Sequence, residues 1–148
     1  MNTVRSFEVR WADVDANGHM RHSAYYDYAA HLRLVMFEEA GISFKKIISM
    51  GIGPALFREE ARFYKEFNLM QIFTIDAAVK KMRKSGKIWI IQHQFFTAEN
   101  QLAATIIVEG TWIDLTTRRA TTPPAELQAI LPNLPHADDF EWLPDKRD

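Results

Sequence analysis

The chain has 148 residues, a formal net charge of −1 and no cysteine, and 47% of its residues are hydrophobic. The lack of cysteine excludes disulfides, cysteine nucleophiles and cysteine-bound zinc, and the near-neutral charge gives no reason to expect nucleic acid as a partner. No apolar stretch approaches the roughly 18 residues that cross a bilayer, and the first residues lack the pattern of a signal peptide. We therefore expect a cytoplasmic protein with one core that binds neither nucleic acid nor membrane.

The first predicted element is a half-buried strand over residues 4–12, where apolar and polar side chains alternate. Its apolar side carries Phe7, Val9 and Trp11. A polar loop follows, and the Asn-Gly pair at 17–18 is its sharpest turn signal.

A long helix is predicted from Tyr25 to Ala40, because apolar residues recur there every three or four positions. Its apolar face comprises Tyr25, Ala29, Leu32, Met36 and Ala40. Ser23 is the expected N-cap, and Gly41 is expected just past the end of the helix. A short second helix or turn is expected over residues 44–50.

After Pro54 the period changes to two, which indicates strands. The first of four strands places one set of side chains on a shared face: Ala55, Phe57, Ala61 and Phe63. The other three strands are predicted over 72–82, 87–97 and 102–115, with hairpin turns between them. Residues 125–131 are expected to form a short helix that closes a single domain over 1–131. Residues 132–148 are interpreted as a partly disordered surface tail.

The order of strand, long helix and four long strands predicts an α+β domain with one layer of helix on one antiparallel sheet. Strands of about ten residues exceed the usual length of about 5–6, and long antiparallel strands twist and curl. Such a sheet has edges to protect, and pairing two edges across a two-fold axis is a common solution. We therefore predict a homodimer with a continuous sheet.

The loop before the long helix carries the most chemistry. It combines two carboxylates, Asp13 and Asp15, with Asn17 and the imidazoles of His19 and His22. A helix N-terminus presents unpaired N–H groups and the positive end of the helix dipole. A carboxylate facing them can attack a carbonyl, or direct water onto it, while the N–H groups stabilise the developing oxyanion. This pattern predicts acyl transfer.

The order of the elements resembles the hotdog fold, in which a curled antiparallel sheet wraps around one central helix. The loop resembles that of the thioesterases related to 4-hydroxybenzoyl-CoA thioesterase. Those proteins carry an Asp shortly after the first strand, a Gly-containing turn and an aromatic start to the helix. Asp15, Gly18, His22 and Tyr25 stand at matching positions. A His seven residues after the Asp is common in bacterial acyl-CoA thioesterases of this branch.

The same stretch also resembles the acyl-carrier-protein thioesterases, which carry Asp-x-Asn-x-His at this place, as Asp15, Asn17 and His19 do. The two resemblances imply hydrolysis of an acyl-CoA or an acyl-carrier-protein thioester to a carboxylic acid and a free thiol. They imply no cofactor and no metal, since coenzyme A belongs to the substrate. They also imply a homodimer or a dimer of dimers.

The resemblance implies a role for each residue of the loop. Asp15 is the nucleophile or general base, and Asn17, His19 and His22 position it or the attacking water. The backbone N–H groups of residues 22–24 form the oxyanion hole. Asp13 is interpreted as structural.

Further candidates for substrate binding are Ser23, Tyr25, Glu60, Arg62 and Lys84. Ser23 belongs to the oxyanion segment, and Tyr25 lines the acyl pocket or packs the loop. Glu60 is expected to reach the site of a partner subunit. Arg62 and Lys84 are candidates for binding the phosphates of coenzyme A or an acidic carrier protein. The alternative for each of these residues is a role without function, either in packing or as a solvated surface side chain.

Two other functions remain open at this point. A dehydratase of 3-hydroxyacyl thioesters would use the same fold, although the early Asp in the loop disfavours it. A module that binds acyl thioesters without turning them over is the second alternative, since a fold does not fix a function.

Overall fold

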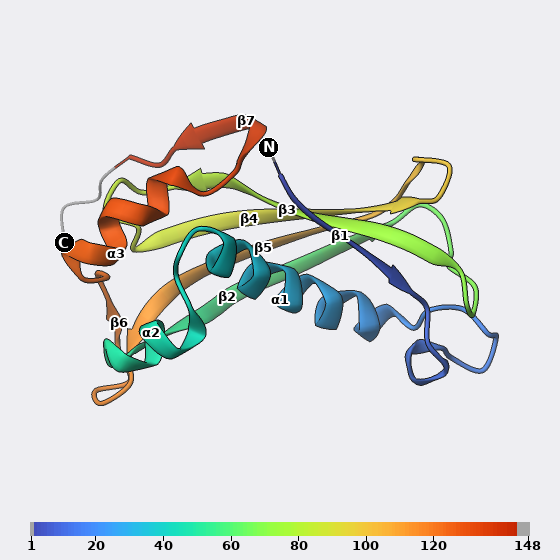
Figure 1. The fold of residues 1–148 in the computed structure, drawn as a ribbon, viewed down its shortest axis with the longest axis horizontal. Helices are drawn as coiled ribbons and strands as arrows, with labels where there is room; N and C mark the ends of the chain where they lie inside the picture. The colour runs from blue at the N-terminus through green and yellow to red at the C-terminus, as the bar shows by residue number, and fades with distance from the viewer. Residues whose placement is uncertain (1, 145–148) are drawn as a thin grey trace.

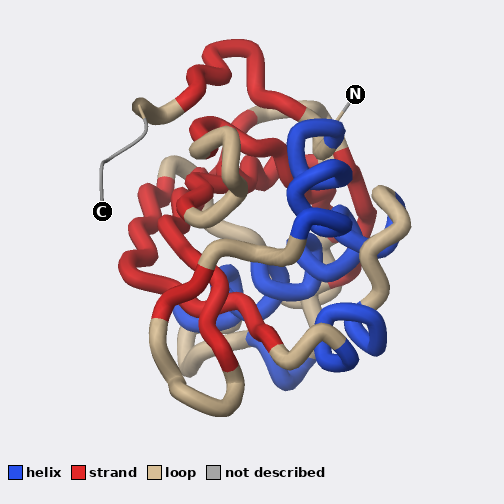
Figure 2. Tube along the Cα trace, turned by 90° about the vertical axis from the view of Figure 1, so that its left-hand side faces the viewer, coloured by secondary structure: helices blue, strands red, loops and turns tan. Residues whose placement is uncertain are grey.

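One sheet curls around a single long helix in the computed structural model, which describes residues 2–144 (Figure 1). Its elements in chain order are β1 (Thr3–Glu8), the 3-10 turn η1 (Trp11–Asp13), α1 (His22–Glu39), α2 (Phe44–Ser49), β2 (Ile52–Phe63), β3 (Ile72–Met82), β4 (Ile88–Thr97), β5 (Leu102–Asp114), β6 (Ala120–Thr121), α3 (Ala125–Ile130), the 3-10 turn η2 (Leu131–Asn133) and β7 (His136–Trp142). Seen from the end, the strands curve around the helical segments (Figure 2). The α+β arrangement predicted from the sequence is confirmed.

The main path of the sheet runs β1-β3-β4-β5-β2, and every pair along it is antiparallel. The bounds of β3 are those predicted, and β4 and β5 differ from their predicted ranges by one residue at one end. These strands are ten residues or longer, so their twist accumulates into a curl. The curl gives the concave face that receives α1.

The helix α1 packs on this concave face through the apolar stripe that the sequence predicted. Four residues of that stripe are buried: Tyr25, Ala29, Leu32 and Met36. The helix begins at His22, three residues earlier than expected, and its N-cap is Arg21, which makes no side-chain cap. The prediction of Ser23 as N-cap is therefore wrong, because Ser23 lies inside the first turn and its Oγ accepts from Arg21 Nε at 3.0 Å. Gly41 follows the helix with a φ of +89°, as a left-handed C-terminal residue.

The first strand is shorter than the range 4–12 predicted for it. β1 ends at Glu8, and the chain then turns through η1, which leaves the side chain of Trp11 80% exposed. Val9 is buried beyond the strand end, where it pairs with the segment after β2 through its N–H to Gln71 O at 2.9 Å. The alternation therefore holds only as far as Val9.

The edge strand β2 contains an irregularity that the sequence pattern did not show. Its register against β5 shifts between Leu56 and Arg58, so Phe57 is an extra residue on this strand. A bulge of this kind reverses which positions face inward. The predicted face that joined Ala55 and Phe57 to Ala61 and Phe63 is therefore wrong, and only Ala61 and Phe63 keep a common phase.

The segment interpreted as a surface tail contains a strand, so the description of residues 132–144 as tail is corrected. β7 runs parallel to β3 and pairs with Val79, Lys81 and Met82, beyond the point where β1 stops covering that edge. Two ion pairs join it to β3, Lys80 to Asp139 at 2.5 Å and Lys81 to Glu141 at 3.6 Å. The rest of the predicted tail, residues 145–148, lies outside the described residues, as does residue 1 of the predicted domain.

A buried polar cluster fastens α1 to the middle of the sheet. Arg33 NH1 lies 3.2 Å from His93 Nε2, and His93 Nδ1 lies 2.9 Å from the carbonyl oxygen of Asp76. Since that carbonyl only accepts, Nδ1 carries the proton and Nε2 accepts from Arg33. Burial, with the charge of Arg33, lowers the pKa of His93 to about 3, so the imidazole is neutral. His93 is thus a structural histidine of the core.

Candidate active site

The loop between η1 and α1 folds back on itself as a miniature hairpin. Val14 pairs with Met20, Asp15 N–H donates to His19 O at 2.9 Å, and Gly18 N–H donates to Asp15 O at 3.0 Å. Gly18 has a φ of +78°, which glycine adopts without strain. The loop therefore holds Asp15 and His19 opposite each other.

A second set of backbone hydrogen bonds fastens this loop to the chain that follows β2. Met20 N–H donates to Phe67 O at 2.8 Å, Leu69 N–H donates to Gly18 O at 3.1 Å, and His19 pairs with Asn68. The segment 67–69 thus holds the residues that precede it beside the loop, although these residues lie far from the loop in sequence.

Asp13 anchors the start of the loop. Its carboxylate accepts from Arg10 Nε at 3.1 Å, from Arg10 NH2 at 3.0 Å and from the hydroxyl of Tyr28. Burial acts to raise the pKa of this carboxyl, but the hydrogen bonds from Arg10 and Tyr28 prevail and hold it below its usual value. Asp13 is buried and saturated with donors, as a structural residue should be.

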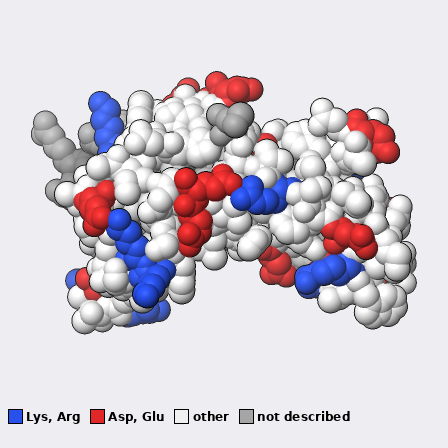
Figure 3. Space-filling model, in the orientation of Figure 1, with Lys and Arg blue, Asp and Glu red and all other residues white. Residues whose placement is uncertain are grey.

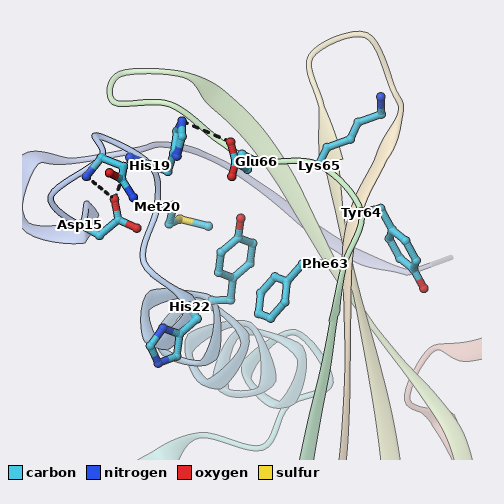
Figure 4. Close-up of a pocket in the computed structure, with 10 residues that line it drawn as sticks. Asp15, His19, Met20, His22, Phe63, Tyr64, Lys65 and Glu66 are labelled. Atoms are coloured by element: carbon cyan, nitrogen blue, oxygen red, sulfur yellow. Dashed lines mark hydrogen bonds and ion pairs between the residues drawn. The ribbon is translucent and has the colours of Figure 1, made fainter.

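A cleft of about 560 Å³ opens between the loop, the start of α1 and the end of β2 (Figure 4). Its lining residues are Asp15, Asn17, His19, Met20, His22, Tyr25, Phe63, Tyr64, Lys65 and Glu66. All four predicted catalytic residues and one predicted substrate-binding residue, Tyr25, therefore meet in one cavity.

The carboxylate of Asp15 is oriented by its own loop. Asp15 Oδ1 accepts from the backbone N–H of Asn17 at 2.9 Å and from that of His19 at 3.3 Å. Oδ2 makes no hydrogen bond within residues 2–144, so one oxygen of an exposed carboxylate remains available at the cleft. Asn17 orients Asp15 through its main chain.

The imidazole of His19 reaches across the cleft to a residue that the sequence did not single out. Its Nε2 lies 3.2 Å from Oε2 of Glu66, and Figure 4 shows the two side chains pointing toward each other. His22 stands apart from this pair at the start of the helix. The only local signal for Glu66 was a charged pair, Lys65-Glu66, directly after the aromatic end of a strand.

Tyr25 forms the aromatic floor near this pair. Its ring packs edge-on against Phe63 at 5.0 Å and stacks against Phe67 at 6.1 Å. Burial, together with the charge of Glu66, raises the pKa of the Tyr25 phenol to about 12. The phenol therefore stays protonated at neutral pH and keeps an O–H that can donate a hydrogen bond.

The N-terminus of α1 supplies fewer free donors than expected. Ala24 N–H donates to Arg21 O at 3.0 Å, so it is already engaged. Within residues 2–144, the N–H groups of His22 and Ser23 have no acceptor. Of the N–H groups of residues 22–24 that were predicted to form the oxyanion hole, those of residues 22 and 23 therefore remain available to bind an oxyanion.

Four predicted substrate-binding residues lie outside the cleft of the same chain. Ser23 is exposed on α1, and Glu60 and Arg62 lie on β2, where Glu60 pairs with Arg58 at 2.5 Å and with Arg62 at 3.6 Å. Lys84 sits in the turn between β3 and β4, at the end of the sheet far from the loop that carries Asp15 (Figure 1). A single chain does not bring these side chains to Asp15.

Charges on the molecule are mixed. On the face drawn in Figure 3, basic and acidic side chains lie next to one another and form no broad basic surface. Among the described residues, no three His, Asp or Glu side chains gather as a metal site. Across residues 2–144, no helix has the length and apolarity that a membrane span requires.

Comparison with known proteins places the chain in a family. A family model described as the thioesterase-like superfamily matches residues 9–131. No curated protein matches the chain. Several solved structures share the hotdog fold with it.

The hypothetical protein SAV2348 from Staphylococcus aureus, solved in complex with CoA, is 18% identical, with a TM-score of 0.82 over 90% of this chain and 83% of that one. Slr0204, a 1,4-dihydroxy-2-naphthoyl-CoA thioesterase from Synechocystis, is 17% identical, with a TM-score of 0.79 over 93% and 100%. YbaW, a probable thioesterase from Escherichia coli, is 20% identical, with a TM-score of 0.76 over 89% and 98%. The chain has the hotdog fold and belongs to the thioesterase-like superfamily.

Proposed function

We propose that this protein hydrolyses an acyl thioester, with acyl-CoA as the substrate, to a carboxylic acid and a free thiol. One observation carries the proposal. Asp15 presents an unbound carboxylate oxygen in a cleft that also contains the open N-terminus of α1. A nucleophile or base opposite free N–H donors is the arrangement that acyl transfer requires.

In the proposed reaction the thioester carbonyl lies against the N–H groups of His22 and Ser23. Asp15 Oδ2 attacks the carbonyl carbon, or takes a proton from a water that attacks it, and the carbon–sulfur bond breaks with its electron pair on sulfur. In the first route the acyl group is left on Asp15 as a mixed anhydride, which water then hydrolyses to the acid. The oxyanion is stabilised by the two N–H groups, and each well-placed donor contributes roughly 3–4 kcal/mol. No metal or cofactor takes part, and coenzyme A enters with the substrate.

The choice of acyl-CoA is supported by two of the structurally similar proteins. SAV2348 was solved with CoA, and Slr0204 acts on a CoA thioester. For this chain the acyl group would lie along the aromatic floor, which includes Tyr25 and Phe63.

The test is product identification. The purified protein is incubated with a panel of short, long and aromatic acyl-CoAs and with 3-hydroxyacyl-CoA, and the products are measured by thiol release and mass spectrometry. We expect equal amounts of free acid and free CoA. Loss of water from the 3-hydroxyacyl substrate without thiol release would identify a dehydratase. Binding of acyl-CoA with no product at all would identify a binding module.

A further inference from the structure

The pair formed by His19 and Glu66 is the feature of the cleft that the proposed function does not yet use. We propose that Glu66 is a positioning residue that orients the imidazole of His19 for proton transfer to the leaving thiolate. This inference rests on the proposed hydrolysis.

The placement of Glu66 is fixed by its neighbours in the chain. Phe67 is fully buried and stacks on Phe73 at 5.0 Å, and its carbonyl accepts from Met20 N–H at 2.8 Å. The backbone of the residue that precedes this anchor is therefore held in place, and its side chain lies at the cleft. The loop that carries His19 is tied to the same segment by the pairing of His19 with Asn68.

The chemistry of the contact fixes the imidazole. Glu66 Oε2 lies 3.2 Å from Nε2 of His19, and an ionised carboxylate attracts a ring nitrogen that carries a proton, so this contact favours the proton on Nε2. The remaining ring nitrogen, Nδ1, is then the one that exchanges protons with the substrate. In acid–base catalysis, a carboxylate often orients a histidine through one ring nitrogen while the other ring nitrogen transfers the proton.

The pair is expected to contribute little to the stability of the fold. The side chain of Glu66 is 73% exposed and that of His19 is 32% exposed. Exposed pairs contribute little to stability because both partners are well solvated. If substitution of Glu66 lowers kcat but leaves the free energy of unfolding unchanged, the effect would therefore come from the orientation of the His19 imidazole.

The proposed step balances as follows. When the carbon–sulfur bond breaks, the thiolate takes the proton from Nδ1 of protonated His19 and leaves as a free thiol. His19, still beside Glu66 through Nε2, regains a proton from the water that supplies oxygen to the acid. This proton comes directly from the water when it hydrolyses the acyl–Asp15 anhydride, or by way of Asp15 when Asp15 acts as the base. Over one turnover, one thioester and one water give one carboxylic acid and one thiol, and the imidazole returns to its starting state.

The test compares Glu66→Gln, Glu66→Asp, His19→Gln and the double variant His19→Gln/Glu66→Gln. The matched control is Glu126→Gln, which removes another exposed glutamate that pairs with Lys46 at 2.5 Å, away from the cleft. General acid–base groups contribute about 10²–10⁴-fold to rates. We expect Glu66→Gln to lower kcat about ten- to a hundredfold with KM within twofold, and Glu66→Asp to recover part of that loss.

The double variant separates positioning from an independent contribution. If Glu66 acts through His19, the double variant is no slower than His19→Gln alone, since coupled residues are not additive. Multiplied losses, or a Glu66→Gln variant with the kcat of the wild type, would overturn the inference while leaving the proposed hydrolysis intact.

The contact between His19 and Glu66 can also be tested by NMR, without measuring enzymatic turnover. The imidazole signals of His19, assigned by their loss in His19→Gln, should shift in the NMR spectrum of Glu66→Gln and stay unchanged in Glu126→Gln. Unchanged signals in Glu66→Gln would refute the contact itself. A wild-type protein that shows the contact but releases no thiol would instead refute the proposed function and, with it, the catalytic role of the pair.

Discussion

At the scale of single residues, the site depends on which backbone donors remain free at the start of α1. The helix begins at His22, whose N–H has no acceptor in the part of the chain that the structure describes, whereas Ala24 N–H is bound to Arg21 O. A side chain at residue 22 and a backbone donor at residue 22 can therefore be tested separately.

We predict that His22→Pro lowers kcat by about 10²–10³-fold, because it removes one oxyanion donor. Proline suits the first position of a helix, where its missing N–H breaks no helical hydrogen bond. Arg21, with φ −66° and ψ 147°, already has the conformation that a residue before proline prefers. Circular dichroism checks that the helix survives.

The matched variant for that experiment is His22→Ala, which removes the imidazole and keeps the N–H. If the backbone donor matters, the alanine variant turns over faster than the proline variant. Equal losses in the two variants would assign the role to the side chain of His22 instead.

The residues of the loop could be recognised from the sequence because they are neighbours in the chain. Asp15, Asn17 and His19 lie within five positions and share one hairpin. Glu66 could not be recognised, since it reaches the site only through the pairing of Phe67 and Asn68 with the loop. No local pattern encodes a contact between such distant segments.

At the scale of elements, the cluster of Arg33, His93 and Asp76 joins α1 to β4 and β3. It buries a cation against a neutral imidazole, and burial lowers the pKa of Arg33 as well as that of His93. The imidazole must stay neutral for Nε2 to accept from Arg33. The attachment of the helix is therefore sensitive to acid.

We predict that the free energy of unfolding falls by about 1 kcal/mol per pH unit below pH 6.5 because of His93. The pKa is about 3 in the folded state and about 6.5 in the unfolded state, so the unfolded chain takes up a proton first as the pH falls. The stability that the neutral imidazole contributes is thus complete above pH 6.5 and is lost toward pH 3.

Urea unfolding at several pH values between 7 and 4 measures this slope. The comparison is the double variant Arg33→Leu/His93→Leu, which removes both the cation and the imidazole, together with the hydrogen bond from His93 to the Asp76 carbonyl. Replacing both members of such a pair by apolar residues is often tolerated. A double variant with the same pH slope as the wild type would contradict the assignment to His93.

Elements were predictable where one period persisted over many residues. The alternation over 72–82 and the helical stripe over 25–36 are of this kind. β7 was missed because its sequence, His-Ala-Asp-Asp-Phe-Glu-Trp, alternates between apolar and polar residues only over its last three positions. Backbone pairing with β3 and ion pairs to Lys80 and Lys81 hold it, and these partners are far along the chain. The bulge at Phe57 was missed for the same reason, since only the register against β5 reveals it.

At the scale of the whole molecule, the long edge strand β2 is the surface that a second copy would cover. It has no partner on its outer side within the described chain, and several large apolar side chains on it and just after it are exposed: Leu56, Phe57, Phe63 and Tyr64. Such an edge invites pairing with another strand. Because Phe63 and Tyr64 also line the cleft, a partner here would help to wall the site.

We predict that the protein elutes as a dimer, at twice 17.2 kDa, in size exclusion with light scattering. Leu56→Glu/Phe57→Glu should convert it to a monomer by placing charge on the edge. The matched variant Val4→Glu changes an exposed position on β1, the opposite edge of the main path, and should remain dimeric. A wild type that is monomeric at micromolar concentration would contradict this assembly.

The central claim is that thioester hydrolysis takes place at Asp15, and the most direct measurement is thiol release from the best acyl-CoA by the wild type and by Asp15→Asn. The substitution keeps the shape of the side chain and removes its charge, so the fold and the Tm should be unchanged. We predict a loss of at least about a hundredfold in kcat, because the nucleophile or base is gone. A folded Asp15→Asn variant that releases thiol at nearly the wild-type rate would contradict the account.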